Sequence, residues 1–256
     1  MHPSEVALRE TLAFVQHYLL PGPQRLLEVG CGSGELAARL QKAGHHVIAL
    51  DSDAAVIEQA RQLGIDARVA VWPDFEEASF DAILFTRSLH HITDLPAAVS
   101  QAYRLLAPRG LLLVEDFAYE TIDLRTSEWC YSLVVLLQAC QVLLLKQGAF
   151  LAALLKREGE LACWQEHHDH DLHSAHTQQA ELSRVFKQVS ESKMAYLYRY
   201  LLPGLPATEQ GYTLAMHLVE LEQRMGQAGG IQLIGRRYLA RKSGENACSL
   251  HSGNPQ

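Results

Sequence analysis

Apolar residues recur in two different patterns along the first half of the chain. Five short apolar runs have the length of strands and occupy residues 25–30, 46–50, 66–71, 80–85 and 110–117, and several of them are nearly all apolar. Three segments with apolar residues at helical spacing occupy residues 34–43, 54–63 and 94–107. Runs without in-and-out alternation are typical of strands buried on both faces of a parallel sheet. Their alternation with helices predicts a doubly wound α/β sheet.

The second half of the chain has a different organisation. Residues 119–165 have helical spacing, and 131–146 is apolar on almost every side. This stretch is too short for a membrane span and is interrupted by polar side chains, so we interpret it as a helix buried in a core or a dimer seam. An apolar wall of a substrate site is the second interpretation.

Shorter segments complete the pattern. We expect Ser4 to cap a first helix that ends before Pro21. The other expected elements are a helix at 177–189, a strand at 192–202, a helix at 208–227 and a last strand at 231–242. The polar residues from 243 onward are predicted to be a disordered tail.

Composition and charge narrow the class of protein. Of the 256 residues, 48% are hydrophobic and 20% are charged, and the formal net charge is −7. This is the composition of a globular domain, and an acidic chain without a long basic run is a poor binder of nucleic acid. The five cysteines are scattered without a C-x-x-C pair, and the N-terminus lacks a signal-peptide pattern. We therefore expect reduced thiols and a cytoplasmic location.

The most informative stretch is LLEVGCGSGELAARL, at residues 26–40. It ends an apolar strand, places glycines at positions 30, 32 and 34, and opens a helix. Glycines there leave the N–H groups of the helix N-terminus open to a ligand. Asp51 ends the second strand, where a carboxylate can accept both hydroxyls of a ribose. Together these features predict an adenosine-type ligand.

Two differences from dinucleotide sites identify the ligand more closely. A G-x-G-x-x-G loop would place its third glycine at position 35, but Glu35 stands there and the third glycine is Gly34. Glu28 lies two positions before the first glycine, and a carboxylate repels a pyrophosphate but accepts an ammonium group. The expected ligand therefore carries a ribose and a cationic group without phosphates, and S-adenosylmethionine fits this description.

These motifs resemble those of class I S-adenosylmethionine-dependent methyltransferases. LLEVGCGSGELAARL is similar to the first motif of that family, and VIALDSD (47–53) is similar to its ribose-binding strand end. SFDAILFTRSLHHI (79–92) and LPAAVSQAYRLLAPRGLLLVEDF (95–117) resemble the fourth and fifth strands of the small-molecule branch. The resemblance implies a Rossmann-like seven-stranded sheet, mostly parallel with an antiparallel last strand. It also implies helices on both faces and a helical insertion after the fifth strand.

The resemblance also implies a division of the chain and a set of cofactor contacts. The divisions are an N-terminal helix at 1–24, an S-adenosylmethionine-binding core at 25–117, a helical insertion or substrate lid at 118–176, completion of the sheet at 177–242 and the tail at 243–256. The cofactor-binding residues would be Glu28, Gly30, Cys31, Gly32, Gly34, Asp51, Ser52 and Thr86. S-adenosylhomocysteine would be the product.

The motifs leave open which residue contacts the adenine. The family often has an acid after the third strand, and the corresponding region here reads VAVWPDFEE, at 69–77. Asp74 is one candidate for that acid. Stacking of the adenine on Trp72 or Phe75 is the alternative.

Two histidines follow the fourth strand, at the sheet edge where such folds bind ligands. Imidazole titrates near neutral pH, so His91 is our candidate base for a hydroxyl substrate, and His90 is expected to face the substrate. Packing within the loop is the alternative for both. Methyl transfer from a sulfonium chiefly needs alignment of nucleophile, methyl carbon and sulfur, so a base is needed only when the acceptor is protonated.

A histidine-rich stretch, WQEHHDHDLHSAH, occupies residues 164–176. We interpret it as a solvated loop leading into a helix that an aspartate or Ser174 caps. Lid residues that face the substrate are the second interpretation, with His173 as the candidate. A metal site involving His170 is the third, but no fourth ligand stands at a recognisable spacing, so no metal is expected.

The insertion and the helix between the last two strands are expected to enclose a pocket, which suits a small organic molecule and not a nucleic acid or a membrane. The candidate substrate residues are His90, Trp129, His173 and Tyr198. Tyr196, Tyr198 and Tyr200 alternate within the expected strand and would share one face, as core or as pocket lining. A homodimer through the apolar helix at 131–155 is a further expectation.

The sequence therefore predicts transfer of a methyl group to an oxygen or nitrogen atom, less readily to carbon, of a small organic molecule. Two alternatives stay open. A nicotinamide-dependent oxidoreductase is disfavoured by the glycine spacing and by Glu28. A cofactor-binding regulator without transfer activity would keep the same motif residues.

Overall fold

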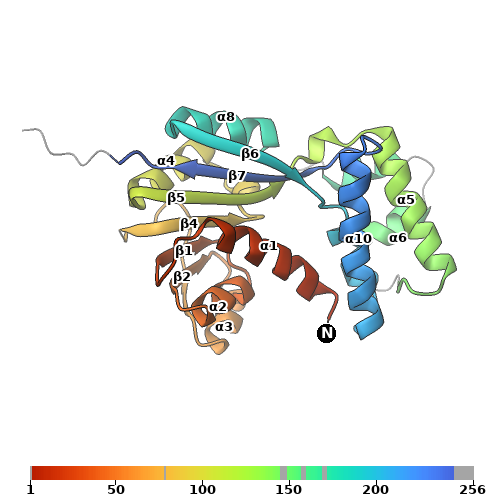
Figure 1. Cartoon of the computed structure of the whole chain (residues 1–256), viewed down its shortest axis with the longest axis horizontal. Coiled ribbons are helices and arrows are strands. Elements are labelled where there is room, and N and C mark those ends of the chain that lie inside the picture. The colour runs from red at the N-terminus through yellow and green to blue at the C-terminus, as the bar shows by residue number, and fades with distance from the viewer. Residues whose placement is uncertain (1, 78, 145–148, 157–159, 169–171, 245–256) are drawn as a thin grey trace, which may run out of the picture.

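A computed structural model describes residues 2–77, 79–144, 149–156, 160–168 and 172–244 (Figure 1). Its strands are β1 (Arg25–Val29), β2 (His46–Asp51), β3 (Asp66–Val69), β4 (Phe80–Thr86), β5 (Leu106–Phe117), β6 (Gln188–Met194) and β7 (Gly235–Arg241). Its α-helices are α1 (Ser4–Tyr18), α2 (Glu35–Lys42), α3 (Ala54–Gln62), α4 (Leu95–Leu105), α5 (Leu124–Ala139), α6 (Ala149–Lys156), α7 (Glu160–His167), α8 (Ala175–Val185), α9 (Tyr198–Leu201) and α10 (Glu209–Gln227).

The seven strands form one sheet in the order β3-β2-β1-β4-β5-β7-β6. The strands from β1 to β5 pair in parallel, whereas β7 runs antiparallel to both β5 and β6. The predicted mostly parallel sheet with an antiparallel last strand is therefore confirmed. The strand order reverses between β1 and β4, and ligands of such sheets bind at the carboxyl ends of the strands beside that reversal.

Alternate side chains of the strands bury against helices on the two faces of the sheet. One face packs on α4 and α8, through residues such as Leu27, Phe85 and Val114. The other face packs on α1, α2 and α3, through residues such as Leu26 and Leu84. Burial on both faces explains why these strands read as continuous apolar runs.

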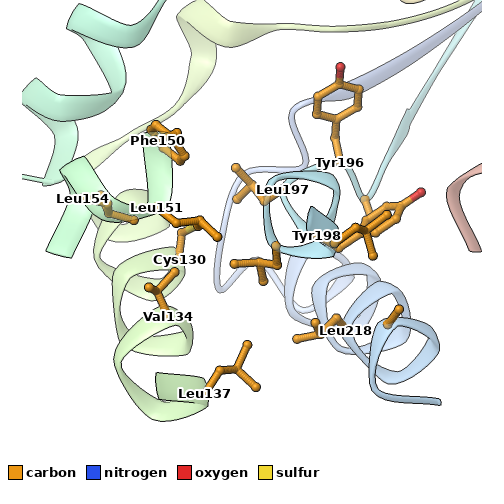
Figure 2. Packing of buried hydrophobic residues seen from close by; sticks show 14 of the residues in the cluster. Cys130, Val134, Leu137, Phe150, Leu151, Leu154, Tyr196, Leu197, Tyr198 and Leu218 are labelled. Carbon is orange, nitrogen blue, oxygen red and sulfur yellow. The ribbon is translucent and has the colours of Figure 1, made fainter. Parts of the chain in front are cut away.

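The helical insertion builds an apolar cluster of its own beyond the carboxyl end of β5, where α5, α6 and α10 stand beside the sheet (Figure 1). Figure 2 shows side chains of α5, among them Val134 and Leu137, directed toward the segment that carries Leu197 and Tyr198. The helix expected to extend through the apolar stretch at 131–146 ends earlier, at Ala139 of α5. Within the described residues, no helix has both the length and the apolar composition needed to cross a bilayer.

The strand expected at 192–202 is wrong beyond Met194. From there the chain leaves the sheet and turns into α9. The Glu222 carboxylate on α10 accepts the backbone N–H groups of Tyr196, Leu197 and Tyr198 at 2.6, 2.9 and 2.9 Å. Because these N–H groups point at a carboxylate, they cannot pair with a neighbouring strand. The three tyrosines therefore do not share a strand face.

Several element boundaries also differ from the expectation. Ser4 does not cap α1 but lies inside it, and its hydroxyl is 2.6 Å from the His2 ring nitrogen Nδ1. The helix expected to end at position 189 ends at Val185, because β6 already begins at Gln188. The last strand is limited to Gly235–Arg241. The predicted cap of α8 is confirmed, since Ser174 Oγ accepts the Thr177 N–H at 3.1 Å.

Candidate functional site

The glycine loop between β1 and α2 has a left-handed backbone at each of its three glycines, with φ of 73°, 53° and 82°. A Cβ atom on Gly30 would lie 2.4 Å from Ser88 Cβ, and one on Gly34 would lie 2.7 Å from Ile65 Cδ1. A Cβ on Gly32 would meet nothing within 4 Å. Gly30 and Gly34 are thus required for packing, whereas Gly32 leaves open space in front of the backbone.

Asp51 at the end of β2 holds this loop in place. Its Oδ2 accepts the Gly32 N–H at 2.9 Å, and its Oδ1 accepts the Asp53 N–H at 3.0 Å. Asp51 and Ser52 line a pocket of about 580 Å³ that also contains Gly30 and Gly32. A carboxylate has about four lone-pair sites, so Asp51 can accept further hydrogen bonds from a ligand in this pocket.

The far side of this first pocket is apolar. Val71 lines it and is 61% exposed, which is high for a large apolar side chain. Trp72 lines it too, but its ring is buried, with Nε1 donating to the Ala98 carbonyl at 3.1 Å. Of the other adenine candidates, Asp74 is exposed outside the pocket, and Phe75 packs within the core beside α4. A flat apolar ligand group fits here best beside Val71.

A second pocket of about 470 Å³ adjoins the first, because Gly30, Gly32 and Arg87 line both. It lies between the glycine loop and the first turns of α1. The site candidates Glu28, Cys31 and Thr86 also line it. The two pockets lie beside each other at the carboxyl ends of β1, β2 and β4, and we call them together the two-pocket site.

Glu28 lies on β1 at the base of the second pocket and is 1% exposed. Burial raises its pKa from 4.5 to about 8, although the Thr86 hydroxyl, the Arg87 charge and a hydrogen bond from the Ala37 backbone counteract this in part. The Thr86 hydroxyl donates to Oε1 at 3.2 Å, whereas buried Oε2 has no hydrogen-bond partner among the described residues. A buried acceptor left without a partner costs about 1–3 kcal/mol. A donor or cation supplied by a ligand would remove that cost.

Cys31 lies in the same loop but has no nucleophilic character. Burial raises the pKa of its thiol to about 12, and the carboxylates of Glu28 and Asp51 raise it further. A thiol with this pKa stays protonated near neutral pH. Cys31 therefore fills space in the loop wall, with Sγ donating to the Gly32 carbonyl at 3.4 Å.

The two histidines after β4 occupy different environments. His91 is exposed and lines the first pocket. His90 is buried, and its Nδ1 lies 2.6 Å from Oδ1 of the buried Asp116 on β5. The centroids of the two imidazole rings are 4.0 Å apart. Of the pair, His91 is the one positioned to meet a ligand in the two-pocket site.

The other three substrate candidates lie outside the two-pocket site. The His173 N–H donates to the His90 carbonyl at 3.0 Å, and its Nε2 is 2.9 Å from the Ile92 carbonyl, so it ties the start of α8 to the loop after β4. Tyr198 is 3% exposed within the insertion core, and Trp129 packs against the same core. Their placement at the substrate remains a prediction.

The metal alternative for the histidine-rich stretch stays untested. His170 lies outside the described residues. Elsewhere in the described part of the chain, no group of three or more histidine, cysteine, aspartate or glutamate side chains could hold a metal ion. His168 instead lies between the Trp164 carbonyl and the Tyr200 hydroxyl, with 2.8 Å to each.

Three charged residues at or near the site were not expected from the sequence. Arg87 lines both pockets, Arg199 on α9 lines the second, and Asp116 contacts His90. Arg87 directly follows Thr86, so the motif itself could have indicated it. No sequence signal indicates Arg199, because its position depends on the turn into α9.

Comparisons with known proteins bear on this site and its fold. Residues 4–188 match a family model described as a methyltransferase domain. An uncharacterized methyltransferase of Mycobacterium bovis is 39% identical over 117 residues, which cover 42% of this chain and 57% of that protein. A ubiquinone biosynthesis O-methyltransferase of Xylella fastidiosa is 35% identical over 152 residues, which cover 56% of this chain and 59% of that protein. The chain thus spans somewhat more than half the length of these relatives.

A solved structure extends the likeness to almost the whole fold. Phosphoethanolamine N-methyltransferase 2 of Haemonchus contortus, in complex with S-adenosyl-L-methionine, superposes with a TM-score of 0.56. The alignment covers 92% of this chain and 52% of that chain at 15% identity. A likeness at this level of identity concerns the fold.

The sheet order, the glycine loop and Asp51 are those of a class I S-adenosylmethionine-dependent methyltransferase. The family match covers well over half of the chain. The chain belongs to the methyltransferase-domain family.

Proposed function

We propose that this protein transfers a methyl group from S-adenosylmethionine to a hydroxyl oxygen of a small organic molecule. The observation that carries the proposal is the combination of Glu28, buried with one unpartnered oxygen, and a glycine loop whose Gly32 leaves room for a ligand. A buried carboxylate suits the cationic amino group of a methionine moiety and would repel the phosphates of a dinucleotide.

Each part of the two-pocket site then has a role in holding the cofactor. Asp51 would accept the ribose hydroxyls, with Ser52 beside it. Glu28 and Thr86 would bind the amino group, and Gly32 would allow the close approach of the ligand to the backbone. The bound cofactor supplies an activated methyl group, so the chain has to orient the acceptor and exclude water.

The adenine would lie against Val71 on the apolar side of the first pocket. We favour Val71 over Trp72, whose ring is buried, and over Asp74 and Phe75, which do not line the pocket. Shape and apolar contact can hold an adenine without an acidic partner.

An oxygen acceptor is favoured over nitrogen by two observations. The curated relative from Xylella fastidiosa is an O-methyltransferase by name and is 35% identical over the shared region. His91 is exposed at the rim of the first pocket, where an imidazole could accept the proton of a hydroxyl group as the oxygen attacks. A nitrogen acceptor that is already neutral would not require such a base.

Transfer of a labelled methyl group tests the proposal. Wild-type protein and Asp51→Ala are incubated with methyl-labelled S-adenosylmethionine and panels of phenols, alcohols, carboxylic acids and amines. We expect label in hydroxyl compounds with the wild-type protein and little with Asp51→Ala. Label only in amines would contradict the oxygen assignment. Binding of S-adenosylmethionine without label in any acceptor would favour a cofactor-binding regulator without transfer activity. Tight binding of NADH would favour a nicotinamide-dependent oxidoreductase.

His91 has its own test within this reaction. If His91 accepts the hydroxyl proton, His91→Asn lowers kcat and removes the imidazole limb from the pH–rate profile. Lys187→Asn, an exposed change away from the site, serves as the control. An unchanged profile in His91→Asn would exclude His91 as the base.

A further inference from the structure

Two arginines, Arg87 and Arg199, line the second pocket, and we call them the cationic wall. The cofactor contacts proposed above do not involve them. Arg199 on α9 lies outside the region that matches the family model. Its side chain is 11% exposed and lines the pocket. Nη2 donates to Glu115 Oε1 at 2.7 Å and to Thr11 Oγ1 at 3.1 Å. Nε is buried and has no hydrogen-bond partner among the described residues.

Arg199 belongs to a cluster in which positive charge exceeds negative charge. Glu115 on β5 is fully buried at its centre. Arg237 donates to Glu115 Oε2 through Nε at 2.8 Å, and Arg87 Nη1 lies 3.6 Å from Oε1. Burial raises the pKa of Glu115, but Arg199 and Arg237 together hold it below its usual range, so the carboxylate is ionised. One carboxylate faces three guanidinium groups.

The other carboxylates around this pocket do not balance the excess. Glu5 pairs with Arg39 at 2.5 Å, and Glu35 accepts the Ser33 hydroxyl at 2.9 Å. Glu10 pairs with Arg9 at 3.3 Å, and both line a separate pocket beside α10, although the Glu10 charge also favours the protonated form of Arg199. In the free protein, burial raises the pKa of Glu28 to about 8, so Glu28 adds little negative charge here until a cationic group binds beside it and favours the carboxylate form. Arg199 is mostly buried and pairs with Glu115 through Nη2 only, whereas the Arg87 side chain is 40% exposed, so the two guanidinium groups keep hydrogen-bond donors for an anion in the pocket.

We propose that Arg199, assisted by Arg87, binds the α-carboxylate of an amino-acid group whose ammonium is bound by Glu28. This inference rests on the proposed function, because the amino-acid group is the methionine end of the cofactor. The second pocket offers both halves of a zwitterion site: the unpartnered Oε2 of Glu28 as an acceptor and two guanidinium groups as donors. A guanidinium fork can hold a carboxylate through two parallel hydrogen bonds.

Thr11 links this site to α1. Its hydroxyl donates to Glu115 Oε1 at 2.6 Å and accepts Arg199 Nη2, so docking of α1 fixes the direction of the guanidinium. Thr11 is 2% exposed and therefore acts as a positioning residue. The carboxylate site is built jointly by α1, β5 and α9, which lie far apart in the sequence.

Two ligands that share the adenosine half separate the carboxylate contact from the remaining contacts. S-adenosylhomocysteine carries the amino-acid end, and 5′-methylthioadenosine lacks it. Calorimetric titration of both into wild-type protein and Arg199→Met measures the contribution of the amino-acid end. We expect Arg199→Met to weaken S-adenosylhomocysteine by roughly tenfold or more and to leave 5′-methylthioadenosine unchanged. Arg199→Lys should recover part of the loss.

Arg237→Met is the matched control, because Arg237 also contacts Glu115 but does not line the second pocket. It should lower the melting temperature without changing the affinity ratio of the two ligands. The proposal would be overturned if Arg237→Met and Arg199→Met lost the same affinity for S-adenosylhomocysteine. It would also be overturned if Arg199→Met weakened the binding of both ligands equally. A third contradicting result would be an Arg199→Met variant that binds S-adenosylhomocysteine as wild type does but has a raised KM for an acidic acceptor. That result would indicate that Arg199 and Arg87 bind the substrate and not the cofactor. Wild-type protein that binds neither ligand would instead refute the proposed function.

Discussion

Gly34 illustrates how one residue can serve the site through packing alone. A Cβ at this position would lie 2.7 Å from Ile65 Cδ1 and 2.8 Å from Ala60 Cβ, and the backbone φ is +82°. We expect Gly34→Ala to destabilise the protein by roughly 2–4 kcal/mol, because strain at positive φ and overpacking add. Gly22→Ala is the control, since its φ is +95° but nothing lies within 4 Å of the added carbon. Denaturant unfolding measures the stability of both variants. An equal loss of stability in Gly34→Ala and Gly22→Ala would contradict the role of packing at Gly34.

Substitution of Gly32 should affect ligand binding and not stability, the reverse of what we expect for Gly34. It has a positive φ of 53° and open space, so Gly32→Ala should cost no more stability than Gly22→Ala. The added carbon would point into space that the cofactor needs, and we expect the affinity for S-adenosylhomocysteine to fall roughly tenfold or more. Calorimetry with both variants is the measurement. Unchanged affinity in Gly32→Ala would show that the ligand does not approach the loop there.

Glu28 makes the stability of the free protein depend on pH. Its pKa is about 8 in the folded chain and about 4.5 when the chain is unfolded. Between these values the folded state holds a proton that the unfolded state releases, so the Glu28 contribution to stability falls as pH rises from about 4.5 to 8. Unfolding curves of wild type and Glu28→Gln at several pH values measure it. The variant should gain stability relative to wild type as pH rises, and parallel curves would contradict the assigned pKa.

Single residues also mark the limit of what the sequence predicts. Glu28, Asp51 and the glycines were identified because the first motif places them at fixed spacing along one strand–turn–helix unit. Arg199 could not be identified in this way. Its position depends on a turn that Glu222 stabilises from another helix, and no local pattern encodes that contact.

At the scale of elements, the junction of β6 and α9 is the clearest departure from the sequence pattern. SKMAYLYRYLL has the aromatic composition of a strand, yet the chain turns after Met194. The reason is tertiary, because Glu222 on α10 binds three successive N–H groups. The parallel strands were predicted better, since burial on both faces imposes a continuous apolar run on each.

Glu222→Gln tests the importance of this junction. Burial raises the pKa of Glu222 to about 7, and the three N–H groups act against that rise. Loss of these hydrogen bonds in a buried position should destabilise the protein by roughly 1–3 kcal/mol. Because the pKa of Glu222 is higher in the folded chain, wild-type stability falls as pH rises from about 4.5 to 7, so the difference between wild type and Glu222→Gln should be largest at the acidic end of this range and shrink toward pH 7. Glu220→Gln is the control, an exposed residue of α10 that pairs with Arg224. Equal stability of the two variants would contradict the role of Glu222.

At the scale of the whole molecule, the insertion carries an apolar surface. Val135 and Leu136 on α5 are 39% and 57% exposed, although the opposite side of the helix is buried. We retain the proposal that a second copy of the chain covers this face. Sedimentation of wild type and Leu136→Glu tests it, with Leu20→Glu, a change at another exposed leucine, as the control. A wild-type monomer at micromolar concentration, or a dimer that survives Leu136→Glu, would contradict it.

We propose, above all, that the two-pocket site binds a cationic, phosphate-free adenosine ligand. Calorimetric titration of S-adenosylhomocysteine into the full chain tests it most directly, with Asp51→Ala and NADH as comparisons. We expect one ligand bound per chain, an affinity at least roughly tenfold weaker in Asp51→Ala, and no heat from NADH. Absence of S-adenosylhomocysteine binding, or equal affinity in wild type and Asp51→Ala, would contradict it.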